Sequence, residues 1–328
     1  MHTLLDPAIL FFVFGLLAGA VKSNLEIPPA ISRFLSLYLL MALGLKGGFA
    51  LAQSGLTQEV SASLGLAIAL AVIVPALGYL LLKRFLSGFD AAAISATYGS
   101  VSAVTFITAV QALDTRGLPY GGHMAAAMAL MESPAIIMAV LLANATRRRL
   151  DAGTRRPEGA VAAPTLSLKH VLHEALTDGA QLLLIGAMVV GLMTGAKGQA
   201  AMQPFAVDLF KGMLAFFLLD MGLLAARHAG GLRGMSPWLL VYAIAGPLVH
   251  ASLALGLAAL FSIEPGNAAL LMVLAASASY IAVPAVIRHA IPEANPSLYF
   301  GMSLGLTFPF NILLGIPLYI SVAHQVLG

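Results

Sequence analysis

The chain has 328 residues, of which 60% are hydrophobic and only 9% are charged, with a formal net charge of +3 and no cysteine. A soluble domain carries about 25% charged residues, so we expect an integral membrane protein. The absence of cysteine excludes disulfides and cysteine-held metals. The start "MHTLLDPAILFF" contains no lysine or arginine, so its apolar run is interpreted as a first membrane span and not as a signal peptide.

Ten apolar segments have roughly the 20-residue length that crosses a bilayer as a helix. We therefore expect an all-α integral membrane protein with ten transmembrane helices. A long polar stretch, "TRRRLDAGTRRPEGAVAAPTLSLKHVLHEALTDG", separates the fifth segment from the sixth. The predicted spans are residues 6–22, 30–52, 60–84, 90–113, 122–144, 175–196, 205–226, 236–262, 266–290 and 298–323.

The basic residues predict an orientation, because cytoplasmic loops are enriched in lysine and arginine. If the long polar stretch is cytoplasmic, connections on that side carry thirteen basic residues, and those outside carry three, Arg116, Lys197 and Lys211. We expect a multi-pass protein of the cell (inner or plasma) membrane with both termini outside. The two halves of five spans then have opposite orientations.

Three motifs of the first half recur in the same order in the second half. "GSVSAVTF" aligns with "ASASYIAV", "MESPAII" with "LTFPFNI" and "LMALGL" with "LLDMGL", at offsets of 177, 175 and 178 residues. We predict a first inverted repeat at residues 1–145, a cytoplasmic linker at 146–174 and a second inverted repeat at 175–328. Many secondary transporters have this architecture, with binding sites where discontinuous helices meet near mid-membrane. Chance similarity among apolar segments is the alternative.

Small polar residues interrupt the fourth and ninth spans. In "YGSVSAVTF" a glycine and serines weaken the helix, and in "AASASYIAVP" Pro284 removes an amide donor. Each break leaves a half-helix N-terminus whose unpaired N–H groups and dipole favour a small anion. Close packing of small residues is the alternative interpretation. The candidate substrate-binding residues are Gly99, Ser100, Val101, Ser102, Ser277, Ala278, Ser279 and Tyr280.

Glu132 lies about halfway along the fifth span, where a carboxylate is costly and therefore a functional candidate. The aligned segment of the second half contributes hydroxyl and amide oxygens, and such hard ligands suit sodium. Two alternatives stay open: a proton carrier, and a protonated carboxyl that only hydrogen-bonds a neighbouring helix. The candidate sodium-binding residues are Thr105, Glu132, Ser133, Thr307 and Asn311. No other metal and no cofactor are expected.

Two further charges fall inside predicted spans, Lys46 in "LGLKGG" and Asp220 in "LLDMGL". Opposite span directions place them toward opposite membrane faces, so we do not expect an ion pair between them. A role as a gate, in coupling or in lining the pore is open for both residues. For Lys46 the alternative is that its long side chain only extends to the nearer membrane–water interface.

Three weaker signals concern histidine and asparagine. His250 is isolated in its span and favours a structural role, although pairing with Ser100 would suit an intramembrane serine hydrolase. The segment "HVLHE", with His170, His173 and Glu174, has spacing compatible with zinc but is explained more simply as the polar face of an interfacial helix. The sequon at Asn144 lies on the predicted cytoplasmic side. No Walker motif is present, so direct use of ATP is not encoded.

At these residues the sequence resembles the sodium-dependent bicarbonate transporters of the SbtA type. The resemblance is carried by "LLMALGLKGGFAL", "ATYGSVSAVTFITA", "MESPAI", "FFLLDMGLLAA" and "SASYIAVPA". It implies a fold of crossed broken helices, like that of NhaA and the bile-acid symporters. A gate domain would comprise spans 1, 2, 6 and 7, and a core domain spans 3–5 and 8–10. It also implies sodium–bicarbonate symport by elevator-type movement, homotrimers and a cytoplasmic PII-like regulator.

The resemblance also assigns roles to residues. It places Ser100, Ser102, Ser277 and Ser279 at the anion-binding breaks, and Glu132 and Asn311 near sodium. The loop between the halves is shorter than that associated with cyanobacterial members, which puts regulation by a partner in question. The alternative functions are a sodium-coupled symporter of another small organic or inorganic anion and a cation/proton antiporter. An antiporter should carry paired carboxylates beside the break, and neither break contains one.

Overall fold

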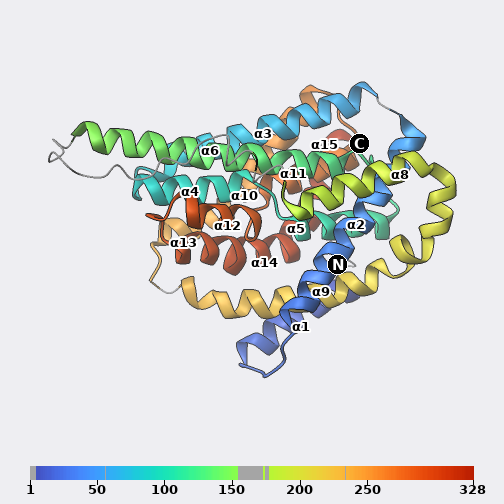
Figure 1. The fold of residues 1–328 in the computed structure, drawn as a ribbon, viewed down its shortest axis with the longest axis horizontal. Coiled ribbons are helices and arrows are strands. Elements are labelled where there is room, and N and C mark those ends of the chain that lie inside the picture. The colour runs from blue at the N-terminus through green and yellow to red at the C-terminus, as the bar shows by residue number, and fades with distance from the viewer. Residues whose placement is uncertain (1–4, 56, 154–172, 174–176, 233) are drawn as a thin grey trace.

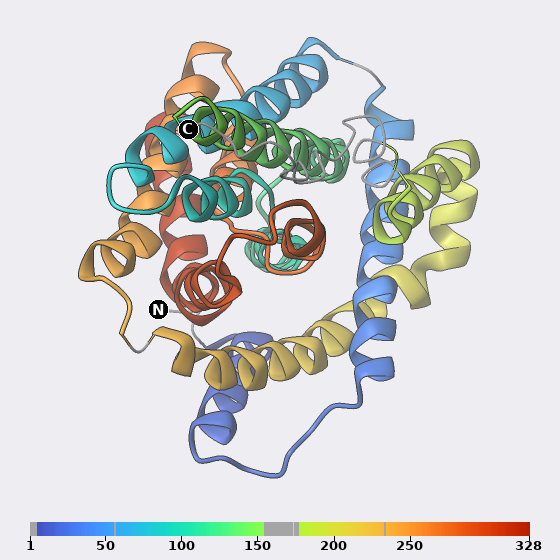
Figure 2. The same cartoon turned by 60° about the vertical axis from the view of Figure 1, so that its left-hand side comes forward.

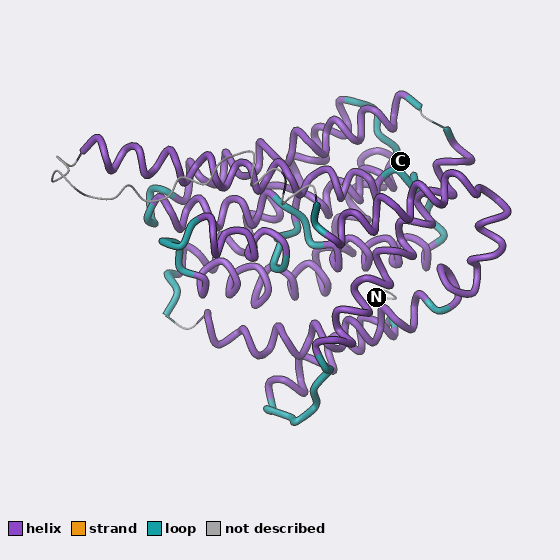
Figure 3. Tube along the Cα trace, viewed as in Figure 1, coloured by secondary structure: helices purple, strands orange, loops and turns teal. Residues whose placement is uncertain are grey.

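The computed structural model describes the chain apart from residues 1–4, 56, 154–172, 174–176 and 233. The described part consists of helices and connecting loops, with no strand (Figure 3). The described part of the chain is therefore all-helical. Within it, seven segments are long and apolar enough to cross a bilayer, as in a multi-pass membrane protein: Pro29–Ser54, Gln58–Leu82, Gly88–Arg116, Met124–Arg148, Gly179–His228, Pro237–Leu260 and Pro296–Leu327.

The predicted ten separate spans are thus not established. Helix α1 (Pro7–Ala20) has 14 residues, and at 1.5 Å per residue it covers about 21 Å, less than the roughly 30 Å hydrocarbon core. The predicted sixth and seventh spans lie in one continuous helical segment. There α8 (Gly179–Gln203) changes direction at Gly195, which has a φ of 54°, and joins α9 (Phe210–His228) through the π-turn η2 (Pro204–Asp208).

Four helices lie together on one side of the molecule (Figure 2). Helix α1 packs along α9, and α2 (Pro29–Ser54) packs along α8. We call α1, α2, α8 and α9 the frame helices. Glycines allow close approach at both crossings: a Cβ on Gly48 would lie 2.9 Å from the Cα of Gly191, and a Cβ on Gly222 would lie 3.0 Å from the Cα of Gly15.

The remaining helices form a second group, which we call the bundle (Figure 1). Its longest member, α6, extends past the other helices at one end (Figure 1). The bundle contains α3 (Gln58–Leu82), α4 (Gly88–Gly99), α5 (Ala103–Arg116), α6 (Met124–Gly153), α10 (Pro237–Leu260), α11 (Pro265–Ala276), α12 (Ala282–Ala290), α13 (Pro296–Met302), η4 (Ser303–Thr307), α14 (Phe308–Phe310), η5 (Asn311–Gly315) and α15 (Ile316–Leu327).

Both predicted helix breaks are confirmed in the bundle. Helix α4 ends at Gly99 and α5 begins at Ala103, and α11 ends at Ala276 before α12 begins at Ala282. A residue larger than glycine does not fit at position 99 without a shift, because a Cβ there would lie 2.5 Å from the Cδ of Pro75 in α3.

Two hydrogen bonds join the breaks directly to each other. The backbone N–H of Ser102 donates to the hydroxyl of Ser277 over 3.0 Å, and the N–H of Ser279 donates to the carbonyl of Thr97 over 2.8 Å. The buried backbone groups that the interruptions expose are thereby satisfied in part by the opposite break. The two interruptions therefore form one structural unit.

Candidate functional site

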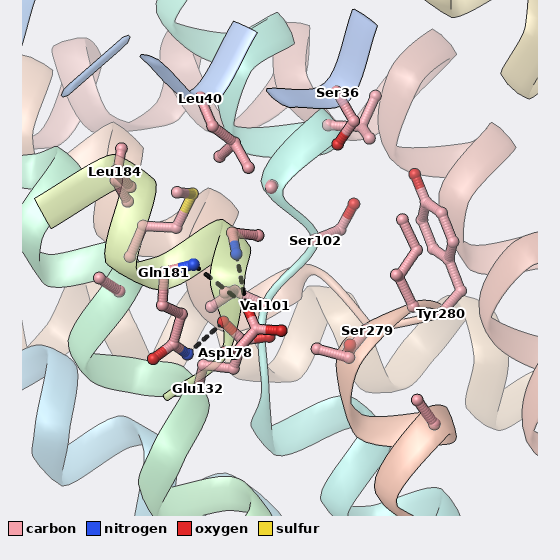
Figure 4. Close-up of a pocket in the computed structure, with 18 of the residues that line it drawn as sticks. Ser36, Leu40, Val101, Ser102, Glu132, Asp178, Gln181, Leu184, Ser279 and Tyr280 are labelled. Atoms are coloured by element: carbon pink, nitrogen blue, oxygen red, sulfur yellow. Dashed lines mark hydrogen bonds between the residues drawn. The ribbon is translucent and has the colours of Figure 1, made fainter. Parts of the chain in front are cut away.

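A cavity of about 250 Å³ lies between the frame and the bundle, where both breaks are accessible. Figure 4 shows Glu132, Asp178 and Gln181 on one side of it and Ser102, Ser279 and Tyr280 on the other. None of the described residues that line the cavity is a lysine, arginine or histidine. The lining residues come from α2, α5, α6, α8 and α12, together with both breaks.

Ser102 is the N-cap of α5, and Ser279 accepts a hydrogen bond from the first turn of α12. The hydroxyl oxygen of Ser102 accepts the N–H of Thr105 over 3.2 Å and the hydroxyl of Thr105 over 2.9 Å. The hydroxyl oxygen of Ser279 accepts the N–H of Val283 over 3.3 Å. Because a serine hydroxyl has one proton and accepts through its lone pairs, these bonds leave the proton of each serine available to donate. The Ser102 hydroxyl also hydrogen-bonds the Tyr280 side chain, which lines the same cavity.

The first turns of α5 and α12 form part of the same wall. Ala103 and Val104 line the cavity at the start of α5, and Ala282 lines it at the start of α12. Amide groups in a first helical turn have no acceptor within the helix and carry the positive end of its dipole. This wall therefore attracts negative charge.

The opposite wall carries two carboxylates. The side-chain amide of Gln181 in α8 donates to the Glu132 carboxylate of α6. Asp178 is the N-cap of α8 and accepts the N–H groups of Ala180 and Gln181, both over 3.0 Å. Two carboxylates without a basic neighbour in the lining favour a cation on this side. The cavity therefore offers an anion-attracting wall facing a cation-attracting wall.

The cavity brings together five of the predicted site residues: Val101, Ser102, Ser279 and Tyr280 from the breaks, and Glu132. Several others are buried near the breaks without lining it. The hydroxyl of Ser277 donates to the carbonyl of Leu274 over 2.9 Å while accepting Ser102, so its role here is structural. The remaining predicted anion-site residues outside the lining are Gly99, Ser100 and Ala278.

The predicted sodium-site residues are distributed over separate contacts. Thr307 donates to the carbonyl of Ala243 over 2.6 Å and contacts the hydroxyl of Tyr98. The amide of Asn311 donates to the carbonyl of Ala276 over 2.8 Å, and its oxygen accepts the hydroxyl of Tyr319. Thr105 supports Ser102, and Ser133 follows Glu132 without lining the cavity. A shared sodium site for all five residues stays a prediction.

Lys46 and Asp220 have different partners, in line with the expectation that they do not pair. Lys46 forms an ion pair with Asp114 of α5 at 2.9 Å and lies 4.7 Å from the centre of the Phe210 ring. Asp220 is buried in α9 and accepts the hydroxyl of Ser32. Lys46 thus links the frame to the bundle, whereas Asp220 makes its contact within the frame.

A serine–histidine pair is contradicted, because the Ser100 hydroxyl has no hydrogen-bond partner. The His250 ring packs instead against Tyr98 and Tyr242, with ring centroids 6.4 and 6.3 Å away. No group of three metal-binding side chains occurs in the described residues. The HVLHE segment falls mostly outside the described residues, with only His173 placed.

Three polar residues that line the cavity were missed by sequence reasoning: Ser36, Asp178 and Gln181. The signal for two of them was present in "TDGAQL", since an aspartate directly before an apolar run is typical of a helix N-cap. Their approach to Glu132 could not be anticipated, because it depends on how α8 packs against α6. Ser36 carries no distinguishing pattern in its span.

Comparison with protein families gives one result. The profile of the Na+-dependent bicarbonate transporter superfamily matches residues 7–324, nearly the whole chain. The family resemblance drawn from the break motifs is thereby confirmed. No curated protein matches the chain.

Proposed function

Because the chain belongs to the Na+-dependent bicarbonate transporter superfamily, we propose that it imports bicarbonate together with sodium through the cavity at the helix breaks. The observation that carries this proposal is the polarity of the cavity. Half-helix N-termini and the protons of Ser102 and Ser279 face Glu132 and Asp178 across it. A small oxyanion and a hard cation fit these two walls.

The same distribution of charge gives a reason why the binding of bicarbonate would be coupled to the binding of sodium. An anion that enters alone meets two carboxylates and no basic side chain in the described lining, so their repulsion opposes its binding. Sodium beside Glu132 would offset that charge and strengthen the site for bicarbonate. Binding free energies linked in this way are reciprocal, so bicarbonate also strengthens sodium binding.

We further propose elevator-type movement of the bundle as the core domain against the frame helices as the gate domain. Polar contacts between the two groups are sparse in the described part of the chain. The clearest are Lys46 with Asp114, Gln181 with Glu132, and the Tyr280 hydroxyl with the sulfur of Met221. An interface with few directional contacts allows one group to slide on the other at low cost.

The inverted repeat is supported by two related contacts. The Asp90 carboxylate at the start of α4 accepts the N–H of Asn295 over 2.8 Å. Asn267, which lies 177 residues later at the start of α11, accepts the N–H of Gly121 over 2.6 Å. In each case a half-helix start in one half binds the loop before the next helix of the other half. This repetition favours the proposed division at residues 1–145 and 175–328.

Other parts of the proposal rest on the family resemblance and the charge distribution. They are a homotrimer, location in the inner or plasma membrane with both termini outside, and a PII-like partner. The predicted linker at 146–174, where such a partner would bind, lies largely outside the described residues. Symport of another small anion stays as the second candidate, because the cavity walls select charge more strongly than chemical identity.

Calorimetry on the purified protein tests the proposal. Bicarbonate should bind in sodium chloride and at least tenfold more weakly in potassium chloride. Glu132→Gln should abolish most of this difference, because the carboxylate that favours sodium is lost, whereas Asp208→Asn, an exposed carboxylate outside the cavity, should preserve it. Equal bicarbonate affinity in both salts would contradict sodium coupling.

A further inference from the structure

The frame and the bundle are closed against each other at the end of α2 that carries Lys46. A Cβ on Gly47 would lie 2.8 Å from the carbonyl oxygen of Gly122 and 3.3 Å from the Cβ of Ala125. A Cβ on Gly122 would lie 2.6 Å from the Cβ of Ala50. The two helices therefore approach each other closely at this point, with the backbone of one against the backbone of the other.

A polar cluster lies beside this glycine contact. Lys46 pairs with Asp114, and the second oxygen of Asp114 accepts the hydroxyl of Tyr120 over 2.8 Å. The side chains of Lys46 and Asp114 are 22% and 33% exposed. A partly exposed ion pair of this kind is weak, so it can form and separate repeatedly. The cluster joins α2 of the frame to α5 and to the loop before α6.

Two cavities lie along α2, and the helix breaks line only one of them. The cavity at the breaks is lined from α2 by Ser36 and Leu40, and the one beside Lys46, of about 280 Å³, by Leu43, Gly47 and Ala50. They share no lining residue, and neither break lines the second cavity. The breaks thus share a cavity with Asp178, while Gly47 and Gly122 line the separate cavity beside Lys46.

We infer that Lys46, Asp114 and Tyr120, together with the contact of Gly47 on Gly122, form a gate that closes one side of the transport path. The structure is then the state open toward Asp178, the side that the charge distribution predicts to be cytoplasmic. This inference rests on the proposed function. During a transport cycle the gate must open, which separates Lys46 from Asp114 and Gly47 from Gly122.

Disulfide cross-linking tests the gate without background, because the native chain has no cysteine. The double variant Gly47→Cys with Ala125→Cys places two Cβ atoms 3.3 Å apart, close to the roughly 3.5–4.5 Å found in disulfides. In proteoliposomes, oxidation should cross-link it and lower sodium-driven bicarbonate uptake at least tenfold. Reduction should restore uptake, and the oxidised single-cysteine variants should keep it.

Complete cross-linking with unchanged uptake would overturn the gate, as would failure of the two cysteines to cross-link. If Gly47→Cys is inactive when reduced, Lys46→Cys with Asp114→Cys and a short bifunctional maleimide provides the same test. Absence of uptake in the unmodified protein would contradict the proposed function instead. The gate is then judged by labelling: Ser102→Cys should react with an impermeant thiol reagent from the Asp178 side only, and reaction from both sides would overturn it.

Discussion

Individual serines at the breaks have distinct tasks that their hydrogen bonds reveal. Ser102 and Ser279 accept bonds from the first turns of α5 and α12, which leaves their protons available to donate at the cavity. Ser277 uses both its oxygen and its proton within the protein. Ser100 also has an unpartnered hydroxyl but does not line the cavity. Of the serines that the break motifs single out, Ser102 and Ser279 are therefore the ones placed to donate to an anion in the cavity.

Replacing either donor should weaken bicarbonate binding. A hydrogen bond to a charged group contributes about 1.5–3 kcal/mol, so Ser102→Ala or Ser279→Ala should lower the affinity roughly 10- to 100-fold. Calorimetry in sodium chloride measures this. The matched control is Ser303→Ala, a buried serine that donates to the Tyr299 carbonyl outside the cavity; its affinity should stay unchanged. Full affinity in both cavity variants would leave only a packing role for these residues.

At the scale of helices, the frame depends on glycines that let two pairs of helices cross closely. A Cβ on Gly48 would overlap the carbonyl oxygen of Met188 in α8 and would lie 2.8 Å from the backbone nitrogen of Leu192. Gly186 of the same helix α8 has no atom within 4 Å of an added Cβ. Crowding is therefore specific to the crossing and is not a general property of glycine in α8.

This contrast predicts different outcomes for two similar substitutions. Gly48→Val should destabilise the protein by about 1–3 kcal/mol or more, because overpacking forces the helices apart. Gly186→Val should have little effect, since the added atoms meet open space. The apparent melting temperature of each variant in detergent provides the measurement. A loss of stability as large in Gly186→Val as in Gly48→Val would refute the crossing as its cause.

An ion pair connects α6 to the loop after α12. The Arg147 guanidinium donates to both carboxylate oxygens of Glu293, over 2.9 and 2.8 Å, and to the carbonyl of Ala290. These bonds hold the pKa of Glu293 below its usual value. Because the folded pKa is lowered, the stabilisation is complete above the unfolded pKa of about 4.3 and is lost as the pH falls through the lower folded value.

The pH dependence of stability should therefore distinguish Glu293→Gln from the native protein. At neutral pH we expect the variant to be less stable by up to about 1 kcal/mol, the value typical of a partly exposed pair. The difference should narrow as the pH falls below about 4.3 and disappear once the native carboxylate is protonated as well. Thermal unfolding in detergent over a series of pH values from neutral downward measures it, with Glu26→Gln, an exposed glutamate, as control. A difference that persists at low pH would show that charge is not its source.

At the scale of the whole molecule, the sequence was most informative where it departs from a uniform apolar pattern. Glycine and serine within the fourth predicted span and Pro284 within the ninth predicted the two breaks, because they weaken a helix locally. Contacts between helices distant in the sequence were not predictable. Glu132 pairs with Gln181 and not with the aligned Thr307 and Asn311, whose polar groups bind nearby helices. The division into ten spans stays a prediction, because hydropathy gives the length of an apolar segment but not where a helix such as α8 bends.

The central claim is that sodium and bicarbonate move together through the cavity between the two breaks. Uptake of radiolabelled bicarbonate into proteoliposomes, with an inward gradient of sodium or of potassium, tests it most directly. We predict accumulation with sodium, which stops when the gradient is collapsed, and no accumulation with potassium. Equal uptake under both gradients, or accumulation only of another anion, would contradict the account.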